Sequence, residues 1–262
     1  MYKKTTGFIL RKKQLGEADS LLIIFSDKLG KIKALAKGIT KTYSKKAGHL
    51  DLLMLSDLEL RENKAYDYII KEAKAINNFP ILRSNLTKTL IAFHLTELID
   101  KTTPWGETNE KIFSLLKNSF DFLERVKYTK RKDLIYFILL FKLNLIKLLG
   151  VRPKLNICLV CQKKISSKEK AYFSPQKGGI VCSICQTPYS KESIELDKEL
   201  IDQLTKMEDG KSENLYLFRE ENFKKISQII DFYIKLISEK DLQSTQIIKK
   251  IKSSLREKEK IN

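Results

Sequence analysis

Four cysteines in two pairs are the residues of this sequence whose types and spacing most clearly indicate chemistry. Each pair has the spacing C-x-x-C, and 20 residues separate the pairs; the four are Cys158, Cys161, Cys182 and Cys185. A C-x-x-C turn places two thiolates on one side of a metal ion, and two such turns complete the tetrahedral shell that zinc prefers. The sequence therefore predicts a four-cysteine zinc site. Because four thiolates leave no position for water, we expect this zinc to be structural.

Two other interpretations of the cysteines remain open. A thioredoxin-like redox role would need only one pair, and neither pair lies in a predicted βαβ unit. Four free thiols are the other alternative. A disulfide scaffold is not expected, because four cysteines in 262 residues are too few for one. The intervening stretch favours a zinc ribbon, because residues 171–173 and 179–181 can pair as a hairpin with Pro175 and Gly178 in the connection.

The second feature is a large excess of basic residues, which gives a net charge of +18. The net charge is +7, +6 and +5 in the successive segments 1–80, 81–153 and 154–190, and zero over 191–262. Such an excess attracts polyanions, of which nucleic acid is the commonest and an anionic membrane the main competitor. A general bias toward lysine could explain part of the excess, but it would not leave the last segment neutral.

The predicted nucleic-acid contacts lie in the first 46 residues, which alone carry a net charge of +9. Basic side chains there can neutralise phosphates, and Tyr43, in the polar loop 38–48, can stack on a base. Phe25 ends a predicted strand and is assigned to the core instead. The full predicted set is Arg11, Lys12, Lys13, Lys31, Lys33, Lys37, Lys41, Tyr43, Lys45 and Lys46.

The elements that position these residues begin with β-structure. Short segments rich in Ile, Leu, Phe and Tyr alternate with Gly- and Asp-containing turns. Five strands within about 75 residues can close on themselves and remove exposed edges, which favours an OB-fold barrel, with an SH3-like barrel as the alternative. The predicted strands are 6–11, 20–25, 31–36, 52–60 and 66–73.

From residue 82 the apolar period becomes helical. The first predicted helix ends before Pro104, and Thr108 or Asn109 can cap the second. The third covers about 132–149, where Gly150 supplies the left-handed residue that follows a helix. Further helices are predicted at 198–206, 221–238 and 243–255.

These elements predict an α+β protein in which an N-terminal OB-fold β-barrel precedes an α-helical bundle with an inserted four-cysteine, zinc-ribbon-like module. The predicted domains are a nucleic-acid-binding barrel at 1–80, the first part of the helical domain at 81–153, the zinc-binding insert at 154–190, and the second part of the helical domain at 191–262.

The sequence offers little for catalysis. His94 lies among apolar residues of the first helix and is predicted to be structural, and His49 lies at a loop end. A Walker loop, G-x-G-x-x-G and H-E-x-x-H are all absent from the sequence. We therefore expect a binding protein rather than an enzyme.

A membrane anchor is not predicted either. The apolar run 134–149 is interrupted by Lys142, Asn144 and Lys147, so it indicates a buried helix rather than a bilayer span. The apolar run at 8–10 is too short for a signal-peptide core. We expect a cytosolic protein.

Several short motifs, in order, resemble the RecO family of bacterial recombination mediators. They span residues 7 to about 190. The matching pieces are GFILR at 7–11, GEADS at 16–20, GK at 30–31, ALAKG at 34–38, Glu97-Leu98, Pro104, Glu107, Asn109, LLG at 148–150, the first Cys pair, FSP at 173–175, GG at 178–179 and the second Cys pair.

The resemblance implies an N-terminal OB-fold, a helical domain and a zinc-finger-like insert. It implies a cytosolic, nucleoid-associated role in DNA repair and recombination after DNA damage: binding single- and double-stranded DNA, annealing complementary strands, and acting with RecR and single-stranded-DNA-binding protein, through the acidic C-terminal tail of the latter, so that RecA can load. It also implies DNA contacts at Arg11, Lys37 and Lys45.

Two other functions remain open on the residues alone. The charge and the cysteines would suit an RNA- or ribosome-associated zinc-ribbon protein equally well. A peptide-recruitment module within 82–150, whose basic helices bind an acidic tail, is compatible with the mediator role.

Overall fold

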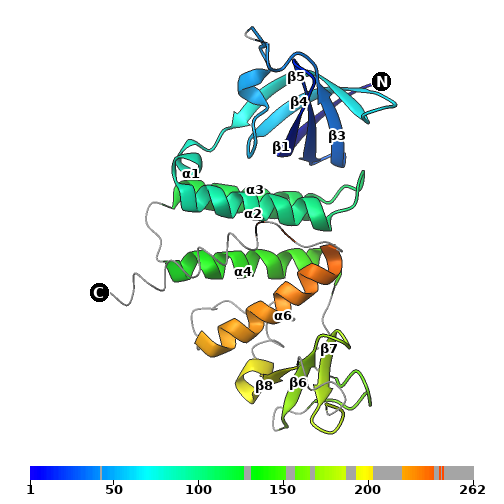
Figure 1. Ribbon diagram of the computed structural model, residues 1–262, viewed down its shortest axis with the longest axis vertical. Helices are drawn as coiled ribbons and strands as arrows, with labels where there is room; N and C mark the ends of the chain where they lie inside the picture. Colours follow the sequence, from blue (N-terminus) through cyan, green and yellow to red (C-terminus); the bar gives the residue numbers. More distant parts are fainter. Residues whose placement is uncertain are drawn as a thin grey trace, which may run out of the picture. The chain divides into compact units, whose positions relative to one another are not determined.

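The computed structural model describes residues 1–41, 43–126, 131–151, 157–165, 169–186, 193–202, 220–238, 242 and 244. Backbone contacts divide these residues into two units. Figure 1 shows their helices and strands, coloured by place in the sequence. One unit contains the described residues up to 141 together with 238, 242 and 244, and the other lies between 142 and 237. The four domain ranges given above stay predictions. Within the described ranges, every helix is too short or too polar to cross a membrane.

The first unit begins with a closed barrel of five strands in the order β1-β2-β3-β5-β4. Neighbouring strands are antiparallel except β3 and β5, which are parallel and meet through two residue pairs, Ala34 with Tyr68 and Leu35 with Ile69. This closed five-stranded arrangement is OB-like and confirms the predicted barrel. The strands are β1 (Tyr2–Leu15), β2 (Asp19–Ser26), β3 (Gly30–Ala36), β4 (Leu55–Glu62) and β5 (Tyr68–Asn77).

The alternation of side chains along each strand gives the barrel two apolar faces. The inner face forms the barrel core, which includes Ile9, Leu22, Ile24, Ile32, Ala34, Leu58, Leu60 and Ile70. Part of the outer face is apolar as well, because it packs on helices. Phe8 lies 5.0 Å from Phe120 and Phe25 lies 6.2 Å from Phe113, measured between ring centroids. Phe25 is therefore buried, as predicted.

The helices that follow are α1 (Pro80–Ser84), α2 (Leu86–Thr102), α3 (Glu110–Arg125) and α4 (Arg131–Leu148). The first predicted helix is broken, because Asn85 adopts an extended conformation and its side chain caps α2 at Lys88 N. Asn109, not Thr108, caps α3 and accepts from Ile112 N at 3.0 Å. Gly150 follows α4 with φ of 77°, in agreement with the predicted helix end.

The second unit contains a sheet in the order β7-β6-β8 and one long helix, α6 (Glu220–Ser238). The predicted hairpin is present as β6 (Ala171–Ser174) and β7 (Gly179–Cys182). The third strand, β8 (Ile194–Leu196), was not predicted and begins beyond the expected end of the insert.

Helix α6 packs on this sheet. The Phe173 ring meets the Phe232 ring edge-on at 5.4 Å, and the Tyr233 hydroxyl donates to Gly178 O at 2.7 Å. Of the two other helices predicted nearby, the first is helical over 198–202. Most of the helix predicted at 243–255 lies outside the described residues.

Candidate nucleic-acid interface and metal centre

A hollow of about 660 Å³ lies on the barrel where β3 ends. Residues that follow β3 form one wall and β5 forms the other. Lysines dominate the lining, which consists of Lys37, Gly38, Lys41, Tyr43, Ser44, Lys45, Lys46, His49, Lys71, Glu72 and Ala73. We call this surface the basic hollow. Among the described residues Glu72 is its only acidic lining residue, so its charge is strongly positive and it suits a polyanion.

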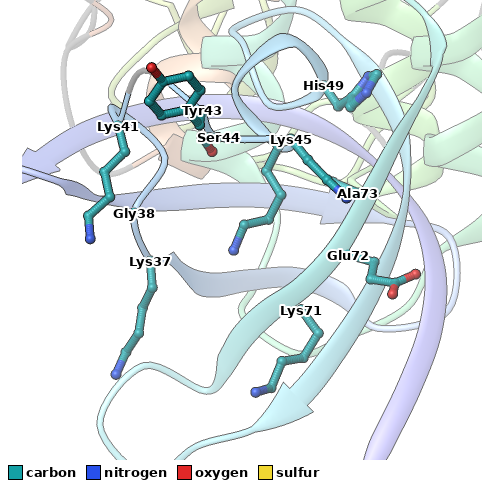
Figure 2. A pocket seen from close by; sticks show the side chains of 11 residues that line it. Lys37, Gly38, Lys41, Tyr43, Ser44, Lys45, His49, Lys71, Glu72 and Ala73 are labelled. Carbon is teal, nitrogen blue, oxygen red and sulfur yellow. The ribbon is translucent and has the colours of Figure 1, made fainter.

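Four ammonium groups of the hollow share one open side. Figure 2 shows Lys37, Lys41, Lys45 and Lys71 extending their amines toward the same space, with the Tyr43 ring at the margin. The Tyr43 side chain is 95% exposed, so its ring is available for stacking. The hollow thus gathers five of the ten predicted contacts: Lys37, Lys41, Tyr43, Lys45 and Lys46.

Lys46 lies deepest among these lysines and donates to Ile70 O at 3.3 Å. Burial lowers the pKa of Lys46, and the nearby Lys71 ammonium lowers that pKa further. The charged form of Lys46 is therefore disfavoured in the free protein, and an anion bound in the hollow would stabilise it.

Lys71 was missed by the sequence reasoning. It lies on β5, 25 residues after Lys46, in a segment of mixed charge. Only the closure of the barrel between β3 and β5 brings it beside the loop. The one available signal was its place directly after the apolar pair Ile69-Ile70, which indicates an outward position at the end of a buried run.

The other five predicted contacts lie elsewhere on the first unit. Lys13 is exposed, and Lys12 Nζ lies 3.8 Å from the Asp51 carboxylate. Lys33 is exposed and its ammonium lies over the ring of Trp105.

Arg11 and Lys31 meet a carboxylate of α2. Arg11 Nε lies 2.9 Å from Asp100, and Lys31 Nζ donates to the Asp100 carbonyl. Lys31 is only 5% exposed. Burial lowers the pKa of Lys31, whereas Asp100 raises it. Lys31 thus joins the barrel to α2, and we leave it out of the proposed interface.

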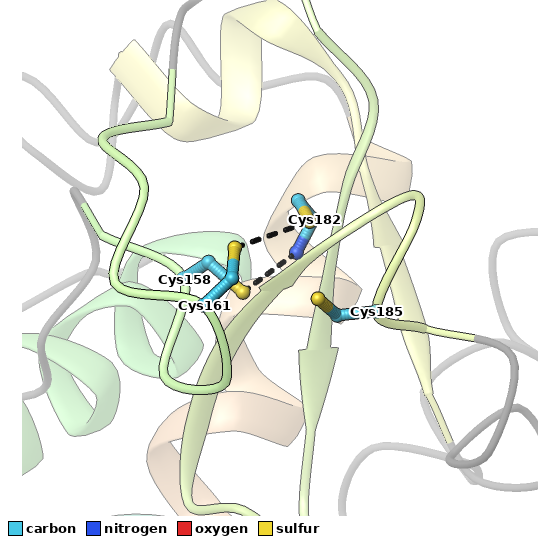
Figure 3. Close-up of side chains that lie close together, drawn as sticks. All are labelled: Cys158, Cys161, Cys182 and Cys185. Carbon is cyan, nitrogen blue, oxygen red and sulfur yellow. Dashed lines mark hydrogen bonds between the residues drawn. The ribbon is translucent and has the colours of Figure 1, made fainter.

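The four predicted metal ligands converge in the second unit, with their sulfur atoms all within 4.8 Å of one another (Figure 3). The cysteines are not disulfide-bonded. Cys161 Sγ and Cys182 Sγ lie 3.9 Å apart. Zn–S bonds of about 2.3 Å in a tetrahedron imply sulfur atoms about 3.8 Å apart. The cluster could therefore hold a metal ion, with two ligands from each turn.

Backbone amides prepare the first turn for an ion. Cys182 N donates to Cys158 Sγ at 3.4 Å. Burial raises the pKa of Cys158, but the backbone N–H groups of Cys161, Cys182 and Val160 outweigh it and lower the pKa to about 6. The hydrogen bond between the Cys185 and Cys182 side chains, together with burial, raises the pKa of Cys185 to about 12. Four thiols this close cannot all ionise without a cation between them.

The histidines take structural positions. His94 is fully buried, and its Nδ1 lies 2.6 Å from Ser244 Oγ. His49 lines the basic hollow, where its Nδ1 accepts from Ala75 N at 3.3 Å. Ser244 also donates to Glu97, so it fixes the described part of the C-terminal segment on α2.

Two family models match this chain. The model "Recombination protein O N terminal" matches residues 1–79, which contain the barrel and the basic hollow. The model "Recombination protein O C terminal" matches residues 83–246, which contain the helices and the cysteine cluster.

Curated proteins named "DNA repair protein RecO" are similar over most of the chain. The protein from Dehalococcoides mccartyi is 32% identical over 213 residues, 81% of each chain. The one from Alkaliphilus metalliredigens is 31% identical and covers 71% of this chain and 72% of its own. The one from Pelotomaculum thermopropionicum is 29% identical over 92% of this chain and 91% of its own.

Proposed function

Because the chain belongs to the RecO family of DNA repair proteins, we propose that it is a recombination mediator. In this role it binds single- and double-stranded DNA and anneals complementary strands. It also helps the recombinase RecA to load on DNA coated with single-stranded-DNA-binding protein, together with RecR. It works in the bacterial cytoplasm, at the nucleoid.

The basic hollow is the observation that carries this proposal. Five lysines line it, Lys37, Lys41, Lys45, Lys46 and Lys71. Each phosphate that such a lysine neutralises releases condensed counterions, which makes the logarithmic salt slope of binding more negative by about 0.7 for a single strand. Lysines contact phosphates without reading the bases, so the hollow accepts any sequence.

Annealing needs charge neutralisation and alignment of two strands, and neither requires a bond to be broken in the protein's own site. Two strands repel each other through their phosphates, and a surface that neutralises phosphates on both lowers that barrier. We therefore propose that the protein acts by binding and alignment, without a catalytic step of its own.

We propose zinc as the ion of the cysteine cluster. The donor set supports it, because four thiolates in tetrahedral reach suit Zn²⁺. When bound, zinc would neutralise the thiolates and crosslink the two C-x-x-C turns. The β6–β7 hairpin ends in Cys182, so the ion would also fix the sheet. This role is structural, since Cys158, Cys161, Cys182 and Cys185 fill the shell.

The protein partners follow from the same proposal. The acidic C-terminal tail of single-stranded-DNA-binding protein would dock on the basic helices between residues 82 and 150, and RecR would join the complex. Binding of the tail peptide, measured on the full chain, tests this part separately from DNA binding.

A strand-annealing assay tests the main proposal. The variant Lys37→Glu/Lys41→Glu/Lys45→Glu/Lys71→Glu reverses the charge of the basic hollow. The matched control Lys164→Glu/Lys177→Glu/Lys198→Glu/Lys235→Glu makes the same change in net charge at exposed positions outside both the basic hollow and the helices between residues 82 and 150. We expect the first variant to lose annealing and the control to keep it. Equal annealing by both variants would remove the hollow from the mechanism.

Competition between matched RNA and DNA oligonucleotides separates DNA handling from an RNA-binding role.

A further inference from the structure

The chain's single tryptophan, Trp105, lies in the segment between α2 and α3 and is attached to the barrel. It forms a parallel bridge with Lys31 of β3, and Gly106 N donates to Lys31 O at 2.9 Å. Its side chain is nevertheless 46% exposed. The largest aromatic ring of the protein is thus fixed to a strand and left half in solvent.

The backbone around Trp105 is held tightly. Gly30, at the start of β3, has φ of 65°, and a Cβ atom built on it would lie 2.1 Å from Glu107 O. The segment after Trp105 therefore rests directly on the backbone of β3. A ring held in this way loses little conformational entropy when a ligand stacks on it.

Two ammonium groups lie over the Trp105 ring. Lys31 Nζ is 4.7 Å and Lys33 Nζ 5.0 Å from the ring centroid. Lys31 is buried and engaged with Asp100. Lys33 is exposed, and within the described ranges its ammonium has no ion pair with a carboxylate. A flat apolar ring and an available cation are thus neighbours.

The register of the sheet adds a second cation at this surface. Arg11 pairs with Ile23, and Ile23 pairs with Lys33, so the three residues form one row across β1, β2 and β3. Residues paired in this way share a face of the sheet. Arg11 is 57% exposed even though it contacts Asp100. The face beside Trp105 therefore carries positive charge that reaches solvent.

A purely structural role does not account for this arrangement. Covering the Lys31–Asp100 contact would explain a buried ring, but Trp105 is half exposed. Lys33 gains little stability from the ring at an exposed site. A nucleotide combines the two complementary groups, a base that stacks on an aromatic ring and a phosphate that pairs with an ammonium.

We propose that Trp105 and Lys33 form a binding site for one nucleotide of an unpaired DNA strand, in which the base stacks on Trp105 and the phosphate pairs with Lys33. This inference rests on the proposed function. Lys33 and Lys37 are four residues apart along β3 and its end, about 13 Å. A strand held by the basic hollow can therefore reach Trp105.

This site distinguishes unpaired from paired strands. The bases of a duplex are stacked on one another and paired, so none can lie flat on Trp105 without being flipped out. The basic hollow contacts phosphates, which both forms present. Trp105 thus holds the unpaired strand and loses its contact when a complementary strand pairs with it, which would favour release of the annealed product.

The fluorescence of Trp105 tests the proposal directly, because no other tryptophan contributes. The full chain is titrated with oligo(dT) and with a DNA hairpin duplex, and binding is followed in parallel by the anisotropy of labelled DNA. We expect saturable quenching by oligo(dT), little change with the duplex, and recovery of fluorescence when oligo(dA) is added to the oligo(dT) complex. Binding of oligo(dT) without quenching would overturn this inference and leave the proposed function standing. Absence of DNA binding would overturn both.

Two variants separate stacking from a structural role. Trp105→Ala should lower affinity for oligo(dT) about fivefold or more and leave duplex affinity unchanged, whereas Trp105→Phe should retain most of the affinity. Lys33→Gln should remove about one phosphate contact, so the logarithmic salt slope of oligo(dT) binding should become less negative by about 0.7. An equal loss for duplex and single strand in Trp105→Ala, with an unaltered salt slope in Lys33→Gln, would show that the ring only supports the fold. Tighter binding of oligo(U) than oligo(dT) would contradict the assignment to DNA.

Discussion

Arg11 of β1 contacts Asp100 near the end of α2, with Nε 2.9 Å from the carboxylate. The Asp100 side chain is only 4% exposed, and Lys31 Nζ lies 3.9 Å from its other oxygen. One buried carboxylate therefore meets two cations where the barrel meets the helices. The positive charge of the buried Lys31 is thus used within the fold rather than offered to a ligand, whereas Arg11 stays half exposed.

Substitution Asp100→Asn should destabilise the barrel–helix contact. Lys31 stays buried without its counter-charge, and we expect a loss of about 2–3 kcal/mol, because the Arg11 half of the interaction is exposed and contributes little. Urea denaturation at neutral pH measures this loss, with the exposed Asp202→Asn as control. An unchanged midpoint would show that Asp100 is not needed to hold Lys31.

The same variant should be less destabilised at high pH. Burial already lowers the pKa of Lys31 below its ordinary value of 10.5, and Asp100 opposes that effect. Without Asp100 the folded-state pKa falls further, so the unfolded chain binds more protons as pH approaches 10.5 and the free energy of unfolding rises. Repeating the urea denaturation just below pH 10.5 checks this prediction. If the stability difference between the unsubstituted protein and Asp100→Asn does not shrink there, the prediction is wrong.

Gly30→Ala should be strongly destabilising. Residue 30 has φ of 65°, and the new Cβ would meet the backbone of Glu107 at 2.1 Å. We expect a cost above about 2 kcal/mol, since backbone strain and a steric clash combine. Gly16→Ala is the matched control, because Gly16 has φ of 60° and open space around it, and should cost about 1 kcal/mol. Thermal unfolding of both variants gives the comparison, and similar losses would show that the Glu107 contact yields easily.

Removal of the metal should unfold the cysteine module and leave the barrel intact. Cys182→Ser deletes one of four ligands, and a structural zinc supplies on the order of 10 kcal/mol to a small module. Metal analysis should show loss of zinc, and amide spectra should lose the signals of β6 and β7 but keep those of β1 to β5. Ser183→Ala, within the same C-x-x-C turn, should keep the metal. A fully folded module after metal loss would show that the ion is not structural.

DNA binding should raise the pKa of Lys46. Burial and Lys71 lower this pKa from 10.5 in the free protein, and a phosphate in the basic hollow favours the charged ammonium. Binding just below pH 10.5 should therefore take up protons. Calorimetry in buffers of different ionisation enthalpy measures the uptake, which Lys46→Gln should reduce. Equal uptake by Lys46→Gln would place the titrating group elsewhere.

The sequence predicts local features of this protein well. The short apolar strands, a helix cap at Thr108 or Asn109, and the cysteine spacing each depend on residues close in the chain. The structure agrees with them, with Asn109 as the cap. The sequence predicts poorly the contacts that depend on closure of the barrel and on packing of the helices against it. Lys71 reaches the basic hollow only because the barrel closes between β3 and β5, and Trp105 reaches β3 only because the helices pack on the barrel. Strand β8 has three residues, too few for an alternating pattern.

The junction of β3 and β5 closes the barrel with only two residue pairs. Such a short ladder should open more readily than the rest, so its amides should exchange with deuterium sooner than those of β1 and β2. The basic hollow spans this junction, with Lys37 just after β3 and Lys71 on β5. A DNA backbone that contacts both lysines would hold β3 and β5 together. Amide hydrogens at the β3–β5 junction should therefore exchange more slowly in the DNA-bound protein than in the free protein.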